Sequence, residues 1–477
     1  MKKVLVANRG EIAMRVMRTV RRMGIRTVAI YSEADRHAPH TRFADEAYCI
    51  GPAPSTQSYL RGETIVELAQ RVGVDGIHPG YGFLSENAAF ARMVQEAGML
   101  FIGPDPHSIE TMGSKLAAKE AAKKYGVPMV PGVEEAISDL ATAQEIGRRV
   151  GYPILIKASA GGGGKGMRIV EREEDLAEQM ERAVSEAISA FGDGAVFIEK
   201  YVSSPRHIEV QILGDKHGNI LWLFERECSI QRRHQKVVEE APSAILTPEI
   251  RYAMGEAAVA AARSCNYHGA GTVEFLVDDQ LNFYFLEMNT RLQVEHPVTE
   301  LITGLDLVEQ QIRIARGEVL AFGQEDLRIQ GHAVELRVYA EDPLNNFLPS
   351  IGRLERYRRP EGDRIRVDDG YEEGMDIPIY YDPLIAKLIT YGANRDEAIQ
   401  RMREAIAAYE ITGPATTLPF GAFVMDHPAF LSGHFDTHFV QQHYSPEILL
   451  ESRRKDAEIA AKLALKLHLA HKRILKA

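Results

Sequence analysis

The chain has 477 residues, of which 45% are hydrophobic and 26% are charged, a composition typical of a globular protein with about two or three domains. A net charge of -11 argues against a general nucleic-acid binder, which needs clustered Lys and Arg to neutralise phosphates, but it leaves room for local basic pockets that bind small anions. Cys49, Cys228 and Cys265 are isolated in sequence and provide neither a disulfide framework nor a zinc-binding spacing. The apolar run after Met1 is too short for an export signal, and no segment has the apolar length of a membrane span, so we expect a cytoplasmic protein.

The N-terminal third alternates short strand-like and helix-like segments, which predicts parallel βαβ units. Residues 3–7 predict a strand, 11–23 a helix and 27–31 the next strand. The first turn contains Gly10 but no G-x-G-x-x-G pattern, so dinucleotide binding is not supported. We expect an α/β domain that mainly supports the rest of the chain.

The middle of the chain contains four consecutive glycines, Gly161 to Gly164, followed by Lys165. Glycine leaves successive backbone N–H groups accessible, so a phosphate can approach the main chain closely. The segment is not a Walker A loop, because no Ser or Thr follows Lys165. It lies between predicted strands at 152–157 and 167–170, which favours a hairpin lid over phosphates rather than a flexible linker.

Beyond the glycine run, strands are predicted at 196–223, at 272–287 and from 332 to about 391, and a helix is predicted at 395–409. The absence of an internal repeat counts against a duplicated synthetase. The segment 446–477 has apolar residues at helical spacing among Lys and Glu. We expect this helix either to pack on its own domain, which the pattern favours, or to dock a partner subunit.

Two glutamates interrupt predicted strands that are otherwise apolar or aromatic. Glu274 lies in the first strand and Glu287 in the second, and Asn289 follows two residues later. A charge inside such a strand is costly unless it is paired or bound to a metal. On adjacent strands the two carboxylates can face each other and share Mg²⁺, with Asn289 adding a neutral oxygen. A buried salt bridge is the alternative.

Two segments rich in polar residues, 225–240 and 289–300, follow apolar runs. A solvated charged surface is the usual interpretation of such segments. However, strand-like alternation would point Arg291, Gln293 and Glu295 in the same direction. Arg and Gln beside a carboxylate can hold a small planar anion while the carboxylate accepts a proton.

Several motifs are specific in combination. They are ANRGEIA from Ala7 to Ala13, HPGYGFLSE from His78 to Glu86, the glycine run, QRRHQK from Gln231 to Lys236, and the segment from Glu287 to Pro297. On these motifs the chain resembles the biotin carboxylase family, within the ATP-grasp superfamily, from Lys2 to about Gln441. The resemblance implies a mixed α/β and α+β fold. It divides the chain into an N-terminal parallel α/β domain at 1–114, a central ATP-grasp domain at 115–330 with a mobile lid at about 131–203, a C-terminal β-rich domain with helices at 331–445, and a helical tail at 446–477.

The resemblance also implies a role for individual positions of this sequence. The implied catalytic residues are Glu295 as general base, Arg291, and Lys236 and Arg337, which would stabilise anionic intermediates and the biotin enolate. The implied metal ligands are Glu274, Glu287 and Asn289, and the implied bicarbonate and biotin contacts are Tyr81, Lys236, Arg291, Gln293, Val294, Glu295 and Arg337. The implied nucleotide contacts are Lys115, Lys157, Gly162, Gly163, Gly164, Met167, Glu199, Lys200, Val202, His207, Gln231, His234, Glu274, Leu276, Glu287 and His438.

The implied reaction uses ATP, Mg²⁺ or Mn²⁺ and bicarbonate to carboxylate N1 of biotin through carboxyphosphate, with ADP and phosphate as products. The chain lacks an Ala-Met-Lys-Met biotin attachment sequence and the length for a carboxyltransferase domain. We therefore expect biotin on a separate biotin carboxyl carrier protein, the second half-reaction on carboxyltransferase subunits, and a homodimer. The final carboxyl acceptor stays open between acetyl-CoA, propionyl-CoA, another acyl-CoA and a 2-oxo acid.

Two other functions are the alternatives to this one. A different ATP-grasp ligase, of the carbamoyl-phosphate or purine-pathway type, would share the carboxylate pair and Asn289, but not the Gln231–Lys236 string with Arg337. A non-catalytic subunit that binds nucleotide as a scaffold is disfavoured, because Lys236, Glu295 and Arg337 are all present.

Overall fold

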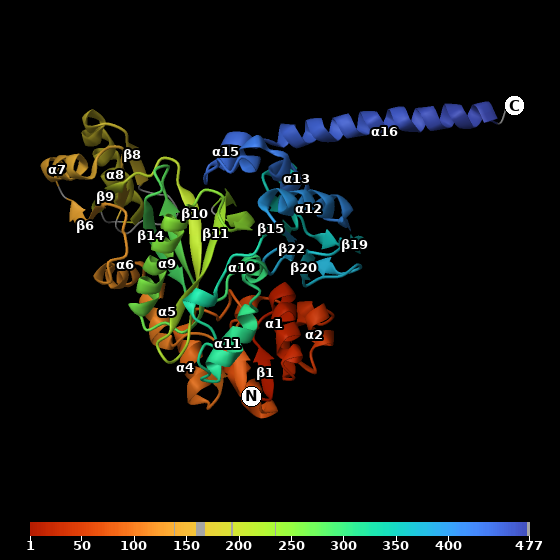
Figure 1. Ribbon diagram of the computed structural model, residues 1–477, viewed down its shortest axis with the longest axis horizontal. Coiled ribbons are helices and arrows are strands. Elements are labelled where there is room, and N and C mark those ends of the chain that lie inside the picture. The colour runs from red at the N-terminus through yellow and green to blue at the C-terminus, as the bar shows by residue number, and fades with distance from the viewer. Residues whose placement is uncertain (138, 159–166, 192–193, 234, 475–477) are drawn as a thin grey trace.

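The computed structural model describes residues 1–137, 139–158, 167–191, 194–233 and 235–474. Its three largest sheets are a five-stranded parallel sheet, an eight-stranded antiparallel sheet and a four-stranded antiparallel sheet. Figure 1 shows the parallel sheet at the base, the four-stranded unit standing away from the body on one side, and the C-terminal helix projecting on the other. The predicted mixed α/β class is confirmed.

The N-terminal unit is the parallel sheet, in the order β3-β2-β1-β4-β5. Its three inner strands, β2, β1 and β4, are apolar and largely buried, as expected when helices on the crossover connections cover both faces of a parallel sheet, whereas the edge strand β3 is only half-buried. The predicted strand, helix and strand at the N-terminus are confirmed within a residue or two. The strands are β1 (Lys3–Val6), β2 (Arg26–Ser32), β3 (Glu46–Gly51), β4 (Gly76–His78) and β5 (Leu100–Phe101), and the helices are α1 (Gly10–Arg22), α2 (Pro39–Phe43), α3 (Gly62–Val72), α4 (Ala88–Glu96), α5 (Pro106–Gly113) and α6 (Lys115–Lys124).

The central sheet runs without a break in the order β14-β13-β10-β11-β12-β15-β22-β20. Strand β12 pairs with β15, so that Glu240 lies opposite Val334 and the sheet continues across the predicted domain boundary at residue 330. The strands are β10 (Arg206–Gly214), β11 (Ile220–Arg232), β12 (Gln235–Ala241), β13 (Gly269–Val277), β14 (Phe283–Asn289), β15 (His332–Tyr339), β20 (Ile365–Asp369) and β22 (Leu384–Gly392), and the helices that follow them include α9 (Pro248–Arg263), α10 (His296–Thr303), α11 (Leu307–Ala315), α12 (Arg395–Ala408), α13 (Leu418–Asp426) and α15 (Phe439–His443).

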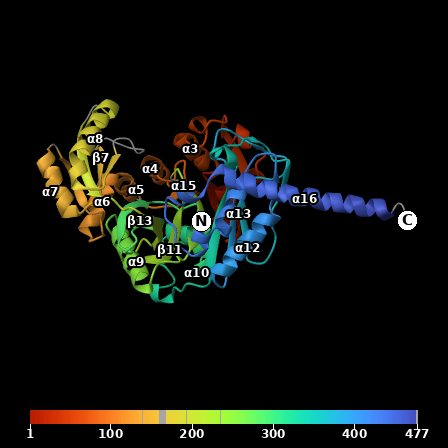
Figure 2. The same ribbon diagram turned by 90° about the horizontal axis from the view of Figure 1, so that it is seen from above.

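The four-stranded unit has a sheet and a small hydrophobic core of its own. Strands β7 and β8 pair antiparallel from Ile154 opposite Val170 to Lys157 opposite Met167, which confirms the predicted hairpin; the glycine run at its tip lies outside the described residues. Viewed from above, the unit stands at one end of the molecule (Figure 2). It comprises β6 (Gly132–Ile137), α7 (Leu140–Val150), β7 (Ile154–Ala158), β8 (Met167–Val170), α8 (Leu176–Phe191) and β9 (Val196–Lys200).

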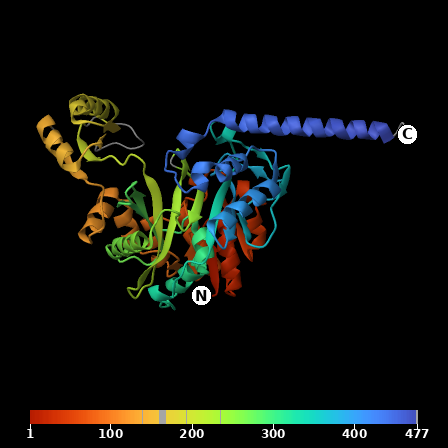
Figure 3. The same ribbon diagram turned by 45° about the horizontal axis from the view of Figure 1, so that its top comes forward.

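The predicted C-terminal helix is present as α16 (Pro446–Ile474). Leu449 in its first turns is 6% exposed, but Ile459 and Leu463 are 64% and 57% exposed. Figure 3 shows that the helix leaves the body after this start. The favoured expectation, packing on its own domain, therefore holds only for the beginning of the helix. Among the described residues, no helix has the length and apolar character of a membrane span.

Candidate active site

The central sheet carries charged side chains on interior strands, where apolar side chains are the rule. Glu209 on β10 lies opposite Arg226 on β11 and opposite Glu274 on β13. Glu209 and Arg226 are fully buried, and Lys236 on β12 exposes 12% of its side chain. Buried charges persist only when they are paired, so these strands must share a charge network.

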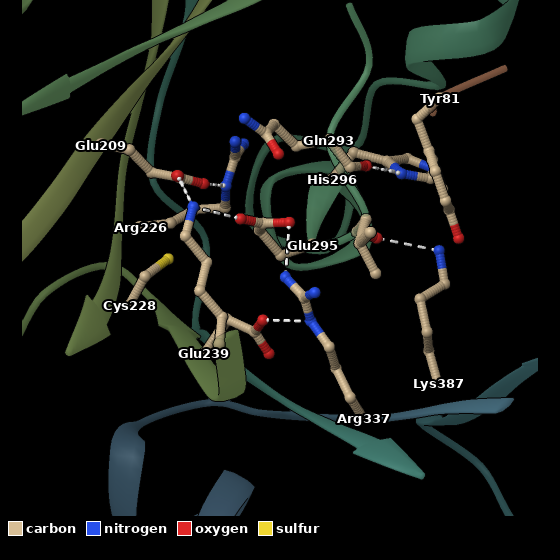
Figure 4. Close-up of polar contacts among 12 residues, drawn as sticks. Tyr81, Glu209, Arg226, Cys228, Glu239, Gln293, Glu295, His296, Arg337 and Lys387 are labelled. Carbon is tan, nitrogen blue, oxygen red and sulfur yellow. Dashed lines mark hydrogen bonds and ion pairs between the residues drawn. The ribbon is translucent and has the colours of Figure 1, made fainter. Parts of the chain in front are cut away.

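Glu295 lies at the centre of this network (Figure 4). It is 0% exposed; its Oε1 accepts a hydrogen bond from Lys236 Nζ at 2.7 Å, and its Oε2 accepts one from an Arg337 guanidinium nitrogen at 3.0 Å. Lys236 Nζ also lies 3.1 Å from Glu274 Oε1, and Arg337 Nε donates to Glu239 Oε1 at 2.5 Å. Each carboxylate oxygen of Glu295 is thus held by a different cation.

The charges around Glu295 decide its protonation state. Burial would raise the pKa of the Glu295 carboxyl, but Lys236, Arg337 and Arg226 outweigh burial and hold this pKa well below its ordinary value. Burial would lower the pKa of Lys236, but Glu209 and the other neighbouring carboxylates hold it well above its ordinary value. Both groups are therefore ionised at neutral pH. Glu295 can accept a proton, and it becomes a stronger base when another anion competes for its two cations.

A carboxylate pair lies beside this cluster. Glu274 and Glu287 are register partners on β13 and β14, and Asn289 Nδ2 donates to Glu274 Oε1 at 2.9 Å. Burial would raise the pKa of Glu274, but Lys236 and His207 hold it far below its usual range. Burial and the charge of Glu274 raise the pKa of Glu287, whose carboxylate makes no hydrogen bond or ion pair with any described residue. Two adjacent carboxylates with one left uncompensated fit a divalent cation that takes oxygen ligands.

Residues 290–295 form a loop, so the strand predicted there is wrong. Strand β14 ends at Asn289 and helix α10 begins directly after Glu295. The prediction failed because alternating polar residues in a loop resemble a strand in sequence. In this loop Arg291 Nε donates to Glu86 Oε2 at 2.8 Å, and another Arg291 nitrogen donates to Gln293 Oε1 at 3.1 Å. Arg291 and Gln293 line the cavity described below, whereas Glu295 is buried beside it.

A cavity of about 840 Å³ lies between the N-terminal unit and the central sheet. It brings together many of the side chains singled out from the sequence, and a cavity of this size holds a drug-sized ligand. Its lining includes the predicted residues Tyr81, Lys115, His207, Gln231, Lys236, Glu274, Glu287, Asn289, Arg291, Gln293, Val294 and Arg337.

Other predicted residues lie away from this cavity. Lys157 forms an ion pair with Glu199, and Lys200 Nζ donates to the backbone carbonyls of residues 151 and 152 at 2.8 and 3.0 Å. His438 lines a second cavity of about 410 Å³, which Gln231 also borders. Met167 is 40% exposed, and Val202 and Leu276 are half-buried outside both cavities. Gly162, Gly163, Gly164 and His234 lie outside the described residues.

The sequence reasoning missed several members of the network. Glu209 and Lys387 each interrupt an apolar strand, which is the same signal that identifies Glu274. Arg226 and Glu239 lie in the polar segment 225–240 without an assigned role, and Glu86 lies in the HPGYGFLSE motif without an assigned contact. The contacts of these residues come from strands and loops that are distant in sequence, so spacing alone does not predict them.

The sheet of paired carboxylates and the adjoining four-stranded unit define a nucleotide-dependent ligase of the ATP-grasp class. Residues 114–322 match the family model "Carbamoyl-phosphate synthase L chain, ATP binding domain", which by itself would allow more than one kind of ligase. The residues on either side of this domain show which kind of ligase it is. Residues 1–109 match "Biotin carboxylase, N-terminal domain" and residues 335–442 match "Biotin carboxylase C-terminal domain". The chain belongs to the biotin carboxylase family, and it is a ligase with ATP- and bicarbonate-dependent biotin carboxylase activity.

Individual relatives agree with the family models. The chain is 53% identical to a pyruvate carboxylase subunit of Methanothermobacter thermautotrophicus over 97% of this chain and 94% of that protein. It is 55% identical to the mitochondrial propionyl-CoA carboxylase alpha chain of Homo sapiens over 93% of this chain, and it spans 61% of that relative's length. The biotin carboxylase domain dimer of Hydrogenobacter thermophilus 2-oxoglutarate carboxylase, solved with MgADP, ADP and bicarbonate, matches with a TM-score of 0.83 and 52% identity over 94% of this chain and 98% of that one.

Proposed function

We propose that this chain performs the first half-reaction of an acyl-CoA or pyruvate carboxylase, as its biotin carboxylase subunit. The observation that carries the proposal is the position of Glu295, which is buried between Lys236 and Arg337 beside a cavity lined by Arg291 and the Glu274 carboxylate. This arrangement offers a base, an anion-binding loop and a cation site within one space.

We assign the nucleotide to the carboxylate end of the cavity. Lys115, which lines the cavity, would contact the ATP phosphates, and Glu274, Glu287 and Asn289 would hold Mg²⁺. Bound Mg²⁺ offsets the charge that develops on the transferring phosphoryl oxygens. We also assign the remaining predicted nucleotide contacts to ATP, and we propose that the four-stranded unit closes over the nucleotide as a lid. These residues are Lys157, Gly162, Gly163, Gly164, Met167, Glu199, Lys200, Val202, His207, Gln231, His234, Leu276 and His438.

We assign bicarbonate to the loop of residues 290–295. Arg291, Gln293 and Val294 bind the anion, and Glu295 takes its proton. Because the bound anion competes with Glu295 for Lys236, it weakens the contact that keeps the pKa of Glu295 low, so the carboxylate becomes a better base when substrate is present. The deprotonated substrate then attacks the γ-phosphate of ATP and gives carboxyphosphate and ADP.

We assign biotin to the end of the cavity nearest Tyr81 and Arg337. Carboxyphosphate yields CO₂ and phosphate there, phosphate removes the N1 proton of biotin, and the ureido nitrogen attacks CO₂. The Arg337 guanidinium, aided by Lys236, stabilises the negative charge on the biotin enolate. Arg337 is oriented for this role because Glu239 and Glu295 hold it from two sides.

The partners that we propose are a separate biotin carboxyl carrier protein, carboxyltransferase subunits and a second copy of this chain. Support comes from the pyruvate carboxylase relative of Methanothermobacter thermautotrophicus, which is named as one subunit of its enzyme. This chain covers that relative almost fully, and the Hydrogenobacter domain forms a dimer. The domain division at residues 114, 330 and 445 and the cytoplasmic location remain part of this proposal.

ADP release by the purified chain tests the proposal. We expect ATP hydrolysis to require bicarbonate, free biotin to accelerate it, and label from bicarbonate to appear in carboxybiotin. Bicarbonate-dependent hydrolysis that biotin does not accelerate, with ammonia accelerating it instead, would favour a carbamoyl-phosphate type of ligase. Nucleotide binding without turnover would favour a scaffold.

A further inference from the structure

Lys387 lies on β22 directly behind the loop of residues 290–295, and it is 0% exposed. Its Nζ donates to the backbone carbonyl of Val294 at 2.9 Å; Figure 4 shows Lys387 and this hydrogen bond. The same Nζ lies 3.3 Å from Glu11 Oε2 and 3.8 Å from Asp368 Oδ2. Removing an ammonium group from water costs several kcal/mol unless its partners compensate. These three contacts therefore hold the Lys387 side chain in place.

Both carboxylate partners of Lys387 are held by other groups. The Tyr81 hydroxyl donates to Glu11, and a guanidinium nitrogen of Arg366 donates to Asp368 Oδ2 at 2.7 Å. The backbone of Glu11 is fixed as well, because Gly370 packs against it so closely that an added Cβ would lie 2.5 Å from the Glu11 nitrogen. The ammonium group of Lys387 therefore occupies a position set jointly by α1, β20 and β22.

Val294 is the residue through which this fixed position acts on the cavity. Its carbonyl belongs to the planar peptide bond that leads into Glu295, so a hydrogen bond to that oxygen restrains the orientation of the whole unit. The Val294 N–H has no hydrogen-bond acceptor among the residues that the structure describes. On the preceding residue, Gln293 Nε2 lies 3.4 Å from Glu274 Oε1, and His296 Nδ1 lies 2.8 Å from the Gln293 carbonyl.

We propose that Lys387 is a positioning residue for bicarbonate: it fixes the Val294–Glu295 peptide, so that Val294 stays in the cavity wall, where the N–H of its other peptide bond can reach the anion, and Glu295 keeps its distance from Lys236. Lys387 does not line the cavity and so would not contact the substrate itself. The inference rests on the bicarbonate site proposed above. It adds a residue from the C-terminal part of the chain that acts on this site only through the backbone.

The variant Lys387→Met tests the inference, because methionine has a similar length and no charge. A hydrogen bond from a charged donor contributes about 1.5–3 kcal/mol, and 1.4 kcal/mol is a factor of ten, so we expect the KM for bicarbonate to rise about tenfold or more. The KM for ATP should change by less than about twofold, because the nucleotide end of the cavity has no contact with Lys387. Rates of ADP release are measured in bicarbonate-depleted buffer against each substrate in turn.

The double variant Lys387→Met with Asp368→Asn separates two effects of losing Lys387: the loss of the hydrogen bond that positions Val294, and the loss of a buried positive charge. It removes one positive and one negative charge together, and Asp368 does not line the cavity. We expect it to melt closer to the wild type than the single variant does, while the KM for bicarbonate stays raised. A normal KM for bicarbonate in either variant, an equal rise in both KM values, or failure of both variants to fold would overturn the inference. Wild-type hydrolysis that requires bicarbonate would leave the proposed function standing in each of these cases.

Discussion

The substitution Glu295→Gln tests the proposed general base most directly, because the two side chains have the same shape and differ in charge and basicity. Glu295 is fully buried and accepts hydrogen bonds from Lys236 at 2.7 Å and from Arg337 at 3.0 Å. The amide keeps one acceptor oxygen but takes up no proton at neutral pH. A positioned base contributes about 10²–10⁴-fold to a rate, so we expect bicarbonate-dependent ATP hydrolysis to fall at least about 100-fold. This fall corresponds to about 2.7 kcal/mol of activation free energy.

The protein should still fold with this substitution. Lys236 Nζ keeps its ion pairs with Glu209 at 2.5 Å and with Glu274 at 3.1 Å, and Arg337 keeps its ion pair with Glu239 at 2.5 Å. Neither cation therefore loses all of its partners. The destabilisation should therefore stay below the roughly 3–5 kcal/mol that follows when a buried charge loses its partner. Calorimetric titration with ATP should give nearly the wild-type affinity.

The assay is ADP release with and without bicarbonate. Glu240→Gln is a matched control, because Glu240 is also buried on β12 but pairs with His332 and Arg395, each at 2.7 Å, away from the cavity. This control should lower thermal stability without changing the dependence on bicarbonate. Turnover of Glu295→Gln within about threefold of the wild type would refute the assignment of the base, since even the smallest contribution expected of a positioned base is larger.

Three further outcomes are expected. Arg337→Ala should reduce carboxybiotin formation at least about tenfold more than ATP cleavage, because its proposed charge partner is the enolate; equal losses in the two assays would contradict that role. Glu287→Gln should raise the Mg²⁺ concentration for half-maximal hydrolysis about tenfold or more, and an unchanged Mg²⁺ titration would remove Glu287 as a ligand. Burial lowers the pKa of His78 and of His40 to about 4, below the ordinary value of about 6.5. As the pH falls from 6.5 towards 4 the unfolded state therefore binds protons that the folded state does not, and at pH 5 each histidine should cost about 2 kcal/mol of stability in urea unfolding. The variant His78→Gln should lack its share, about half, of the stability that the two histidines together cost at pH 5. A loss of stability equal to that of the wild type would show that His78 does not contribute to it.

Much of the architecture follows from local sequence patterns. Apolar runs of four to seven residues predict β1 and β2, and the run of glycines between two apolar segments predicts the hairpin of β7 and β8. The joining of β12 to β15 does not follow in this way, because Glu240 and Val334 are far apart in the chain and their pairing depends on tertiary contacts.

The residues of the site also fall into those that local sequence predicts and those that depend on tertiary contacts. Glu274 and Glu287 are predictable, because a carboxylate in an apolar strand is costly wherever the strand lies. The loop of residues 290–295 resembles a strand in sequence, because alternation of polar residues has the same period whether or not a sheet partner exists. The pairing of Lys387 with the Val294 carbonyl joins residues 93 positions apart, and no local pattern contains that information.

The unbroken sheet from β14 to β20 limits how this protein can be recombined with its relatives. An exchange at residue 330 would replace β15, β22 and β20 and would require a foreign strand to match the hydrogen-bond register of β12 from Val238 to Ala241. An exchange of the unit from β6 to β9 would carry its own sheet and its own hydrophobic core with it. Chimaeric enzymes should therefore tolerate a transplanted four-stranded unit better than a transplanted C-terminal half.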